Sequence, residues 1–394
     1  MMQYRKFGKI DWQPSALGFG CMRLPIIDGK AGNIDYAKAE AMVHKAIEAG
    51  VTYFDTAYVY HEQKSEIFVG KALAGGLRDK IRLATKSPVW LVNEPGDFDR
   101  LLDEQLKRLQ TDHIDFYLLH ALNRDSFKDK VLKHDLIQRG EAAKADGRIR
   151  HLGFSFHDNT ETFKTIVDSY DKWDFCQIQY NYMDTTVQAG TEGLKYAASK
   201  GLGIVIMEPL LGGKLALDVP AVRPLWASAS RQASATNQAS PADWALQWLW
   251  SQPEVGVVLS GMSTMEQVEQ NIASASQSAV GKLTAADNEL IAKVRELMNS
   301  LSPIPCTRCE YCLPCPNGVN IPRNFDSYNK ALMFDILADS RFDYKNWISD
   351  DSKAERCIQC DECLSKCPQK IAISTWMPIV GEVLGLGREY VKSI

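Results

Sequence analysis

The amino-acid sequence predicts an α/β fold, in which a closed (β/α)8 TIM barrel is followed by a small, mainly helical domain. Eight short runs rich in β-branched residues alternate with segments of helical periodicity up to Gly261. That alternation is typical of a parallel barrel in which each strand is followed by a helix. Eight of the ten cysteines then lie between Cys306 and Cys367, which indicates a separate metal-binding segment. We expect the barrel to span residues 1–300 and the second domain residues 301–394.

The expected strands come from the β-branched runs, and they are Ala16–Cys21, Thr52–Thr56, Ile81–Lys86, Asp115–His120, Arg150–Ser155, Phe175–Gln179, Gly203–Met207 and Gly256–Gly261. The expected helices between them include Tyr36–Ala49, Glu66–Ala74, Phe98–Leu109, Glu161–Asp168 and Thr191–Lys200. An open doubly wound sheet is the alternative. It normally carries a Gly-x-Gly-x-x-Gly turn after an early strand, and Leu17–Met22 lacks the third glycine.

The later part of the barrel contains clear helix signals. Residues 219–240 are rich in Ala, Ser, Pro and Gln and predict a surface excursion on a barrel loop. Ser240 followed by Pro241 predicts an N-cap and first helical residue, opening a helix through Trp250. Thr284 caps a further helix to about Leu301, and the prolines of residues 302–305 then break it and mark the domain boundary.

Composition excludes several classes of protein. The 394 residues carry 45 basic and 49 acidic side chains, for a formal charge of −4. No excess of positive charge remains to neutralise a nucleic-acid backbone, so we expect no nucleic-acid partner. No apolar run approaches the length of a membrane span, and the N-terminal residues 1–12 lack the apolar stretch of a secretory signal. We therefore expect a cytoplasmic protein.

The cysteines form two related motifs. The first is Cys306-x2-Cys309-x2-Cys312-x2-Cys315-Pro316, and the second is Cys357-x2-Cys360-x2-Cys363-x3-Cys367-Pro368. Three cysteines at this spacing wrap around one [4Fe–4S] cluster, and the cysteine before proline ligates the other cluster in two-cluster ferredoxins. One cluster would thus take the first three cysteines of the first motif and Cys367, and the other would take the first three cysteines of the second motif and Cys315.

Two alternatives to this ligand assignment remain. Structural zinc usually uses pairs of ligands separated by a loop, which differs from triplets ending in Cys-Pro. The last spacing of the first motif is two residues where the regular motif has three, so a single cluster on the second motif is also open. We expect two clusters rather than one.

Four polar residues lie where barrel strands end. Asp55 follows Tyr53-Phe54 near the end of the second expected strand, Tyr60 follows five residues later, and Lys86 and His120 close the third and fourth strands. A lone lysine at such a place is more often a solvated charge, and a lone histidine is more often part of the structure. Because a barrel carries its chemistry at the C-terminal ends of its strands, the four together predict one catalytic site.

The sequence resembles the aldo/keto reductase superfamily from residue 4 to about Asn271. The residues that carry the resemblance are Tyr4-Arg5-Lys6-Phe7-Gly8, Leu17-Gly18-Phe19-Gly20, Phe54-Asp55-Thr56-Ala57, Lys86, Leu118-Leu119-His120, Gly147-x-Ile149-Arg150-x-Leu152-Gly153-Phe154-Ser155 and Gln267-x-x-x-Asn271. Together with the cysteine-rich tail, the chain resembles the iron–sulfur branch of that superfamily, with a C-terminal ferredoxin-type domain.

The resemblance implies a barrel that binds NADP or NAD in extended form, and a catalytic tetrad of Asp55, Tyr60, Lys86 and His120. Tyr60 would supply the proton for carbonyl reduction, with its pKa brought down by the Lys86 ammonium. Asp55 would hold that lysine in place, and His120 would orient the substrate carbonyl.

The resemblance also implies cofactor-binding residues, which match the family less closely. Ser155 and Gln177 would hold the nicotinamide carboxamide, while Phe156 stands where the family usually has Asn, and Met207 stands where an aromatic residue stacks on the ring. The expected phosphate-binding residues are Gly212, Gly213 and Lys214. The expected adenosine-end residues are Ser260, Gly261, Gln267 and Asn271. For Gln267 and Asn271 the alternative is a solvated helix surface, and the basic residues that many relatives place around a 2′-phosphate are absent.

These observations predict an oxidoreductase that interconverts a small-molecule carbonyl and alcohol with NAD(P)H. One alternative is an electron-transfer protein whose barrel binds a cofactor or a redox partner protein and does not use the tetrad for carbonyl reduction. Another is a nicotinamide-sensing module. Since no flavin motif is evident to split a hydride into single electrons, we expect clusters that do not exchange electrons with the barrel cofactor.

Overall fold

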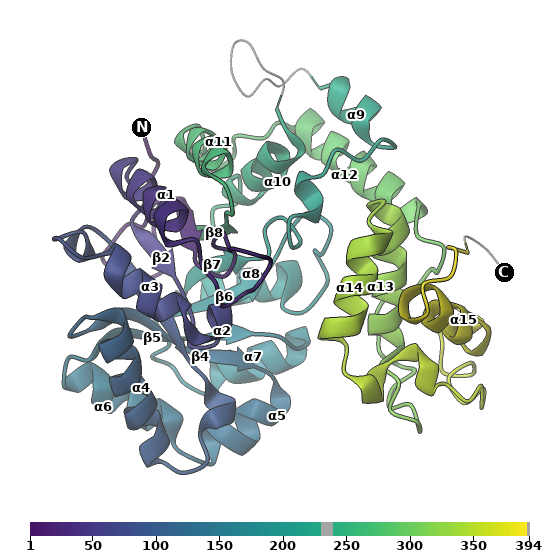
Figure 1. Cartoon of the computed structure of the whole chain (residues 1–394), viewed down its shortest axis with the longest axis horizontal. Coiled ribbons are helices and arrows are strands. Elements are labelled where there is room, and N and C mark those ends of the chain that lie inside the picture. Colours follow the sequence, from purple (N-terminus) through teal and green to yellow (C-terminus); the bar gives the residue numbers. More distant parts are fainter. Residues whose placement is uncertain (230–238, 392–394) are drawn as a thin grey trace. The chain divides into compact units, whose positions relative to one another are not determined.

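The computed structural model describes residues 1–229 and 239–391, and the described chain forms two compact units. The first unit is a closed parallel barrel with strand order β1 to β8 (Figure 1). Its strands are β1 (Leu17–Gly20), β2 (Tyr53–Asp55), β3 (Arg82–Ser87), β4 (Ile114–Leu122), β5 (Ile149–Phe156), β6 (Phe175–Gln179), β7 (Gly203–Met207) and β8 (Val257–Gly261). All eight predicted strands are confirmed, with bounds within two residues of those expected.

Helices surround the barrel. They are α1 (Tyr36–Glu48), α2 (Tyr60–Gln63), α3 (Ser65–Ala72), α4 (Gly96–Leu109), α5 (Arg124–Ser126), α6 (Leu136–Ala145), α7 (Thr160–Asp168), α8 (Gly190–Ser199), α10 (Pro241–Trp250) and α11 (Met265–Ser276). Short helical segments lie at η1 (Arg78–Lys80), η2 (Val89–Leu91), η3 (Phe127–Leu132) and η4 (Lys214–Ala216). The predicted N-cap of α10 is confirmed, because the Ser240 hydroxyl accepts a hydrogen bond from the Asp243 N–H (3.1 Å).

An aromatic cluster fills the interior of the barrel at its N-terminal end. Phe7 is fully buried and packs edge-on against Phe116 at 5.7 Å between ring centroids. Glycines at the starts of two strands make room for it, because a methyl carbon on Gly203 or Gly256 would overlap the Phe7 ring. The N-terminal segment therefore closes this end of the barrel, which leaves the opposite end, where the strands terminate, for the site.

The second unit is mainly helical. It contains α9 (Arg223–Ala227), most of α12 (Ala285–Ser300), α13 (Ile321–Met333), α14 (Leu337–Trp347), η5 (Asp350–Ser352), η6 (Ala354–Arg356), α15 (Ile373–Val380) and η7 (Gly381–Gly385). Its own apolar core includes Phe325, Tyr328, Trp376 and Met377. The predicted surface excursion over residues 219–240 contains the unexpected helix α9, and its residues 230–238 lie outside the described chain. No helix in the described ranges is both long and apolar enough to span a bilayer.

Candidate active site and cysteine centre

A buried ion pair lies at the centre of the barrel mouth. The Lys86 ammonium donates hydrogen bonds to Asp55 Oδ1 at 2.6 Å, to the Thr56 carbonyl at 2.8 Å and to Tyr60 Oη at 3.3 Å. Lys86 is 1% exposed and Asp55 is 3% exposed. The strand register explains why Asp55 and Lys86 lie together. The parallel neighbours β2 and β3 pair Asp55 with Ala84, which lies two residues before Lys86 on the same face. The structure thus brings three of the four predicted residues into one hydrogen-bonded chain.

The protonation states of Asp55, Lys86 and Tyr60 depend on their burial and on their charges acting on one another. Burial acts to lower the pKa of Lys86, but Asp55 and Tyr60 together raise it above its usual value, so the lysine stays a cation. Burial raises the pKa of Asp55, and the Lys86 ammonium opposes that shift. Burial also raises the pKa of Tyr60, although Lys86 acts in the lowering direction. The predicted net lowering of the Tyr60 pKa is therefore wrong, because desolvation outweighs the lysine.

His120 completes the group at the end of β4. Its ring centroid lies 6.3 Å from that of Tyr60, with the two rings nearly perpendicular at 81°. Burial and the charge of Lys86 hold the pKa of His120 well below its usual value, so the imidazole is neutral at physiological pH. Its Nδ1 is buried and has no hydrogen-bond partner among the described residues. The side chain is therefore available to a ligand that enters the mouth.

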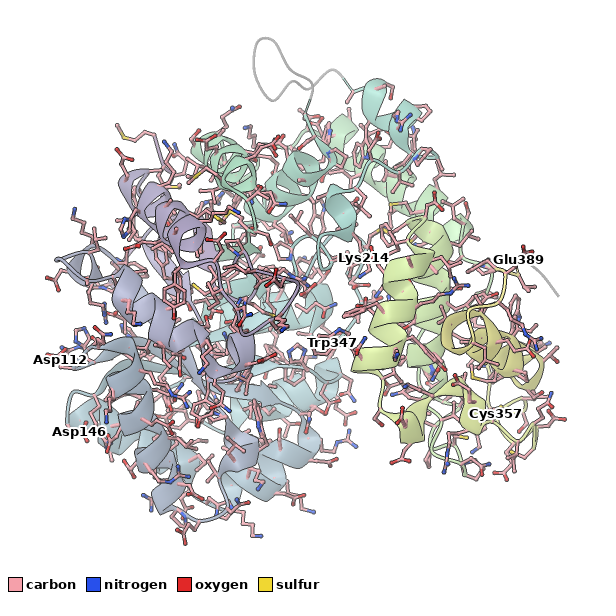
Figure 2. All side chains as sticks on the ribbon, in the orientation of Figure 1. Asp112, Asp146, Lys214, Trp347, Cys357 and Glu389 are labelled. Atoms are coloured by element: carbon pink, nitrogen blue, oxygen red, sulfur yellow. The ribbon has the colours of Figure 1, made fainter. Side chains whose placement is uncertain are left out.

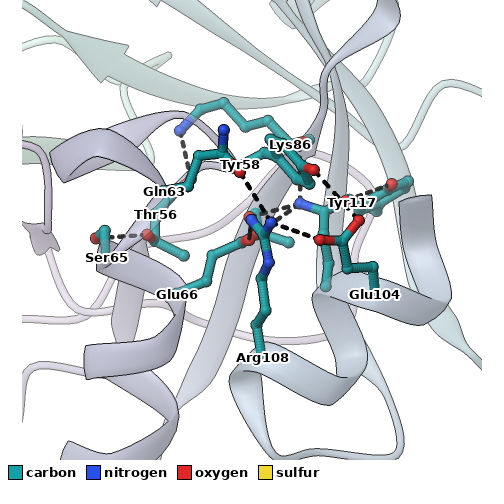
Figure 3. Close-up of polar contacts among 11 residues, drawn as sticks. Thr56, Tyr58, Gln63, Ser65, Glu66, Lys86, Glu104, Arg108 and Tyr117 are labelled. Atoms are coloured by element: carbon teal, nitrogen blue, oxygen red, sulfur yellow. Dashed lines mark hydrogen bonds and ion pairs between the residues drawn. The ribbon is translucent and has the colours of Figure 1, made fainter. Parts of the chain in front are cut away.

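A polar network behind β3 fixes the backbone that carries Lys86 (Figure 3). Glu66 of α3 is fully buried and accepts hydrogen bonds from Thr85 Oγ1 (2.7 Å) and Gln105 Nε2 (2.6 Å). The Gln105 amide also donates to the Lys86 carbonyl (3.1 Å). Arg108 pairs with the Glu66 carboxylate at 3.3 Å. A buried carboxylate needs such partners, and here they connect α3 and α4 to the strand residue beside the site.

The segment after Tyr60 has an unusual backbone. His61, Glu62 and Gln63 have φ values of 49°, 52° and 68°, in the left-handed region that costs non-glycine residues about 1–2 kcal/mol each. His61 compensates for part of this cost through its ring. Its Nε2 accepts from the Leu24 N–H (3.2 Å), and its Nδ1 lies 2.7 Å from the Ala31 carbonyl. The loop after β1 therefore holds the residue that follows Tyr60.

Ser155 and Gln177 lie side by side, because they are paired in the register of β5 and β6. Ser155 Oγ accepts from the Ala121 N–H (2.8 Å). Gln177 is 2% exposed and donates through Nε2 to the Met207 sulfur (3.7 Å). Its Oε1 is buried without a partner in the described chain. A carboxamide N–H is the donor that this oxygen lacks, so these residues fit a nicotinamide.

Phe156 takes no part in this arrangement. Alternation along β5 turns Ser155 into the barrel and Phe156 outward. There the Phe156 ring is fully buried and packs edge-on against Phe163 of α7, with centroids 5.0 Å apart. The Phe156 side chain therefore lies in the helix layer and does not fill the barrel mouth, although it departs from the family pattern.

The loop after β7 approaches the mouth through two glycines. Gly212 and Gly213 have φ values of 68° and 94°, a conformation that glycine adopts without strain. Lys214 follows in η4, and Figure 2 marks its side chain. The residues Gly212, Gly213 and Lys214 thus present backbone and positive charge together, as expected for a phosphate-binding loop.

Two of the predicted adenosine-end residues, Ser260 and Asn271, contact each other. Asn271 of α11 is 6% exposed and donates to Ser260 Oγ (2.9 Å). Gln267 accepts through Oε1 from the Ser263 N–H (2.8 Å). Gly261, the last residue of β8, lies between these two contacts in the chain and is exposed. For Asn271 the alternative of a solvated helix surface is wrong, because the side chain is buried against β8.

Sequence reasoning missed two residues at the mouth. Trp90 of η2 lies against His120, with ring centroids 5.1 Å apart, and is 41% exposed. Its place four residues after Lys86 was a signal that could have been used, because residues following a barrel strand line the site. Arg23, two residues after Cys21, reaches Gly212 and Gly261. No local pattern in the sequence indicates those contacts.

The two cysteine motifs fold into matching loops. In the first motif, Arg308 and Glu310 have positive φ, and in the second the equivalent residues Gln359 and Asp361 do as well. The fourth cysteines match too, because the Gly318 N–H donates to Cys315 O (3.0 Å) as the Lys370 N–H donates to Cys367 O (3.1 Å). The backbones of the two motifs therefore match up to the third cysteine and again after the fourth.

Cys312 and Cys315 of the first motif both lie near cysteines of the second motif. One pocket is lined by Cys312 and Cys315 together with Cys357, Cys360 and Cys363, and Figure 2 marks Cys357. Burial and the thiols of Cys315 and Cys360 raise the pKa of Cys357. In the first motif, burial and the thiols of Cys306, Cys309 and Cys363 raise the pKa of Cys312 to about 11. Cys367 packs against the same apolar core as Cys306.

The two cysteine motifs supply eight thiol donors. Across residues 1–229 and 239–391, no three His, Cys, Asp or Glu side chains are grouped as ligands of a single metal ion. A cubane cluster binds each of its cysteines through a different iron. The donor set of the two motifs therefore fits iron–sulfur ligation.

Comparison with known proteins agrees with both units. Residues 16–296 match the model of the aldo/keto reductase family, and residues 305–372 match the model of the 4Fe-4S dicluster domain. The chain is similar to L-galactose dehydrogenase from Arabidopsis thaliana, with 27% identity over 75% of this chain and 94% of that protein. It is also similar to a probable aldo-keto reductase from Glycine max, with 28% identity over 68% of this chain and 82% of that protein.

Solved structures show the same fold. The aldo-keto reductase AKR11C1 from Bacillus halodurans, in its holo form, is 27% identical, has a TM-score of 0.58 and covers 74% of this chain and 96% of its own. An aldo-keto reductase from Klebsiella pneumoniae in complex with NADPH is 23% identical, has a TM-score of 0.60 and covers 75% of this chain and 95% of its own. With the barrel, the polar group at its mouth and the match over residues 16–296, this chain belongs to the aldo/keto reductase family and carries a C-terminal 4Fe-4S domain.

Proposed function

We propose that the barrel interconverts a carbonyl and an alcohol by hydride transfer with NAD(P)H. The observation that carries the proposal is the hydrogen-bonded chain from Asp55 through Lys86 to Tyr60, at 2.6 and 3.3 Å. It places a proton donor beside a buried cation at the mouth of the barrel. The nicotinamide supplies the hydride when it is bound. Ser155, Gln177 and the 212–214 loop hold it, and the unpartnered Gln177 Oε1 supports that fit.

Tyr60 is the general acid of this reaction. Because burial raises its pKa, the phenol is protonated at neutral pH and ready to donate to a carbonyl oxygen. Lys86 stabilises the phenolate that remains after the proton leaves, since the ammonium lies 3.3 Å from Tyr60 Oη. Asp55 keeps the ammonium in place. Alcohol oxidation requires the phenolate, so the oxidation rate should rise with pH.

His120 orients the substrate. The neutral imidazole can hydrogen-bond a carbonyl oxygen without competing with Tyr60 for a proton. Trp90 packs against the His120 ring and offers an exposed apolar surface next to it. We propose that this surface contacts the part of the substrate adjacent to the carbonyl.

In residues 301–394 we propose two [4Fe–4S] clusters. Cys315, Cys357, Cys360 and Cys363 would hold one, supported by the pocket that these four line together with Cys312. Cys306, Cys309, Cys312 and Cys367 would hold the other, supported by the matching backbone of the two loops. We also propose that the protein is cytoplasmic. The alternative function is that of an electron-transfer protein, whose barrel binds NAD(P)H without carbonyl turnover.

The substitution Tyr60→Phe tests the proposed reaction. It should lower kcat for carbonyl reduction by about 100-fold or more, the usual contribution of a general acid, while the dissociation constant for NADPH stays within about twofold. Turnover of a panel of aldehydes and ketones, with a fluorescence titration of NADPH, measures both quantities. Tyr36→Phe is the control, because Tyr36 is an exposed tyrosine outside the site. An unchanged kcat in Tyr60→Phe would remove Tyr60 from the role of acid.

A further inference from the structure

The three residues after Tyr60 form a left-handed turn. His61 (φ 49°, ψ 48°) and Glu62 (φ 52°, ψ 45°) have the dihedral angles of the left-handed helical region, and Gln63 follows with a φ of 68°. Residues with a Cβ normally enter that region one at a time, because each of them is strained there. A run of three persists only where the surrounding structure holds it, and strain of this kind gathers at functional sites.

The His61 ring ties this turn to the loop after β1 by two hydrogen bonds. Its Nε2 accepts from the Leu24 N–H at 3.2 Å, so in the neutral ring the proton is on Nδ1. Nδ1–H then donates to the Ala31 carbonyl, 2.7 Å away. Burial lowers the pKa of His61, which favours the neutral ring that makes both bonds. Both ring nitrogens are therefore engaged with the backbone of one loop.

The other two residues of the turn are held by different parts of the barrel. The Glu62 carboxylate lies against Gly32, because a methyl carbon on Gly32 would lie 2.5 Å from Glu62 Oε2. Gln63 Oε1 accepts from the Arg108 guanidinium of α4 at 3.0 Å (Figure 3). Arg108 is itself paired with Glu66 at 3.3 Å. The loop after β1 and helix α4 thus fix the left-handed turn together.

The geometry points to His61 as a positioning residue for Tyr60, which aims the phenol at Lys86 by holding the left-handed turn. Tyr60 directly precedes the turn, and its Oη lies 3.3 Å from Lys86 Nζ, at the long end of hydrogen-bond distances. Without the imidazole, the backbone is free to relax toward the right-handed region that residues with a Cβ prefer, and such a change rotates the chain at Tyr60. This inference rests on the proposed function, because it assumes that Tyr60 is the general acid.

Three substitutions of His61 in the full-length holoprotein test the inference. His61→Phe keeps a planar ring on the strained backbone but removes both nitrogens. His61→Gly removes the ring and the strain together. His61→Gln is the conservative variant, because its Oε1 accepts from the Leu24 N–H in place of Nε2. His44→Phe is the control, since His44 also binds a backbone carbonyl, that of Ala72 at 2.9 Å, but lies on α1.

His61→Phe and His61→Gly should lower kcat for carbonyl reduction by about tenfold or more, because a misplacement of about 1 Å already costs about 100-fold. The Kd for NADPH, from fluorescence titration, should stay within about twofold of the wild type. His61→Gln should recover most of the lost kcat, and His44→Phe should match the wild type. NMR of protein labelled with [ζ-13C]tyrosine reports on the phenol without turnover. The Tyr60 resonance, assigned by its loss in Tyr60→Phe, should shift in His61→Phe and return in His61→Gln.

Each other outcome also has a definite meaning. A wild-type kcat in His61→Phe or His61→Gly overturns the inference, and the proposed function stands. Equal losses of kcat and of NADPH affinity overturn it as well, because the whole mouth is then disturbed. A His61→Gln variant as impaired as His61→Phe shows that the hydrogen bond is not what positions Tyr60. If the wild type reduces no carbonyl compound, the proposed function fails, and the Tyr60 resonance decides the inference: a shift that His61→Gln reverses supports it, and an unchanged resonance overturns it. A thermal melt of each variant shows that it is folded.

Discussion

Removing the Lys86 ammonium should turn a buried ion pair into a single buried charge, with a measurable cost in stability. In Lys86→Met the side chain keeps its length, but Asp55, which is 3% exposed, loses the partner at 2.6 Å. An uncompensated buried charge of this kind costs about 3–5 kcal/mol. We therefore expect Lys86→Met to lower the free energy of unfolding by about that amount at pH 8 and to lose carbonyl reduction.

The stability loss in Lys86→Met should depend on pH, because burial raises the pKa of Asp55. Without Lys86, burial is the dominant influence on Asp55 and raises its pKa in the folded state above the unfolded value of about 3.9. A raised carboxyl pKa destabilises the fold at high pH, where the unfolded state is ionised, and the penalty disappears as the pH falls through the folded pKa. The stability difference from wild type should therefore shrink on acidification, by up to about 1.4 kcal/mol per pH unit.

Urea unfolding followed by tryptophan fluorescence, at pH 5, 6, 7 and 8, measures this difference. Lys107→Met is the matched control, because Lys107 is exposed on α4. The double variant Lys86→Met/Asp55→Asn should recover most of the stability, since the amide carries no charge. A Lys86→Met protein as stable as the wild type at pH 8, or a stability loss that is the same at pH 5 and pH 8, would refute the reasoning.

Two further predictions concern the cysteine domain. Anaerobically purified protein should contain about eight irons and eight sulfides per chain if both motifs are filled; a content near four contradicts two clusters, and zinc without sulfide contradicts iron–sulfur ligation. Excess NADPH or NADH mixed anaerobically with the protein should leave the absorbance near 400 nm unchanged and give no EPR signal, because a hydride carries two electrons and a cluster accepts one. Rapid bleaching without added flavin would show that the barrel and the clusters exchange electrons.

The sequence was sufficient for the features that depend on local patterns. The strand Gly203–Met207 has the predicted bounds, because burial on both faces of a strand requires a continuous apolar run. The Cys-x2-Cys-x2-Cys triplets indicated two related loops, and the two loops have positive φ at equivalent positions. Asp55, Lys86 and His120 were identified from their places at strand ends, and parallel pairing in a barrel brings such ends together.

Other features were decided only by the tertiary structure. The pKa of Tyr60 is raised because desolvation exceeds the effect of Lys86, and desolvation depends on how much protein surrounds the phenol. Phe156 points away from the barrel interior because β5 continues through it, which the sequence match alone did not reveal. The sequence showed Arg23 only as an arginine in a loop. Its approach to Gly212 and Gly261 depends on barrel closure, which brings the loop after β1 next to β8 and to the loop after β7. Arg23 and Gly212 lie side by side in this way although some 190 residues separate them in the sequence.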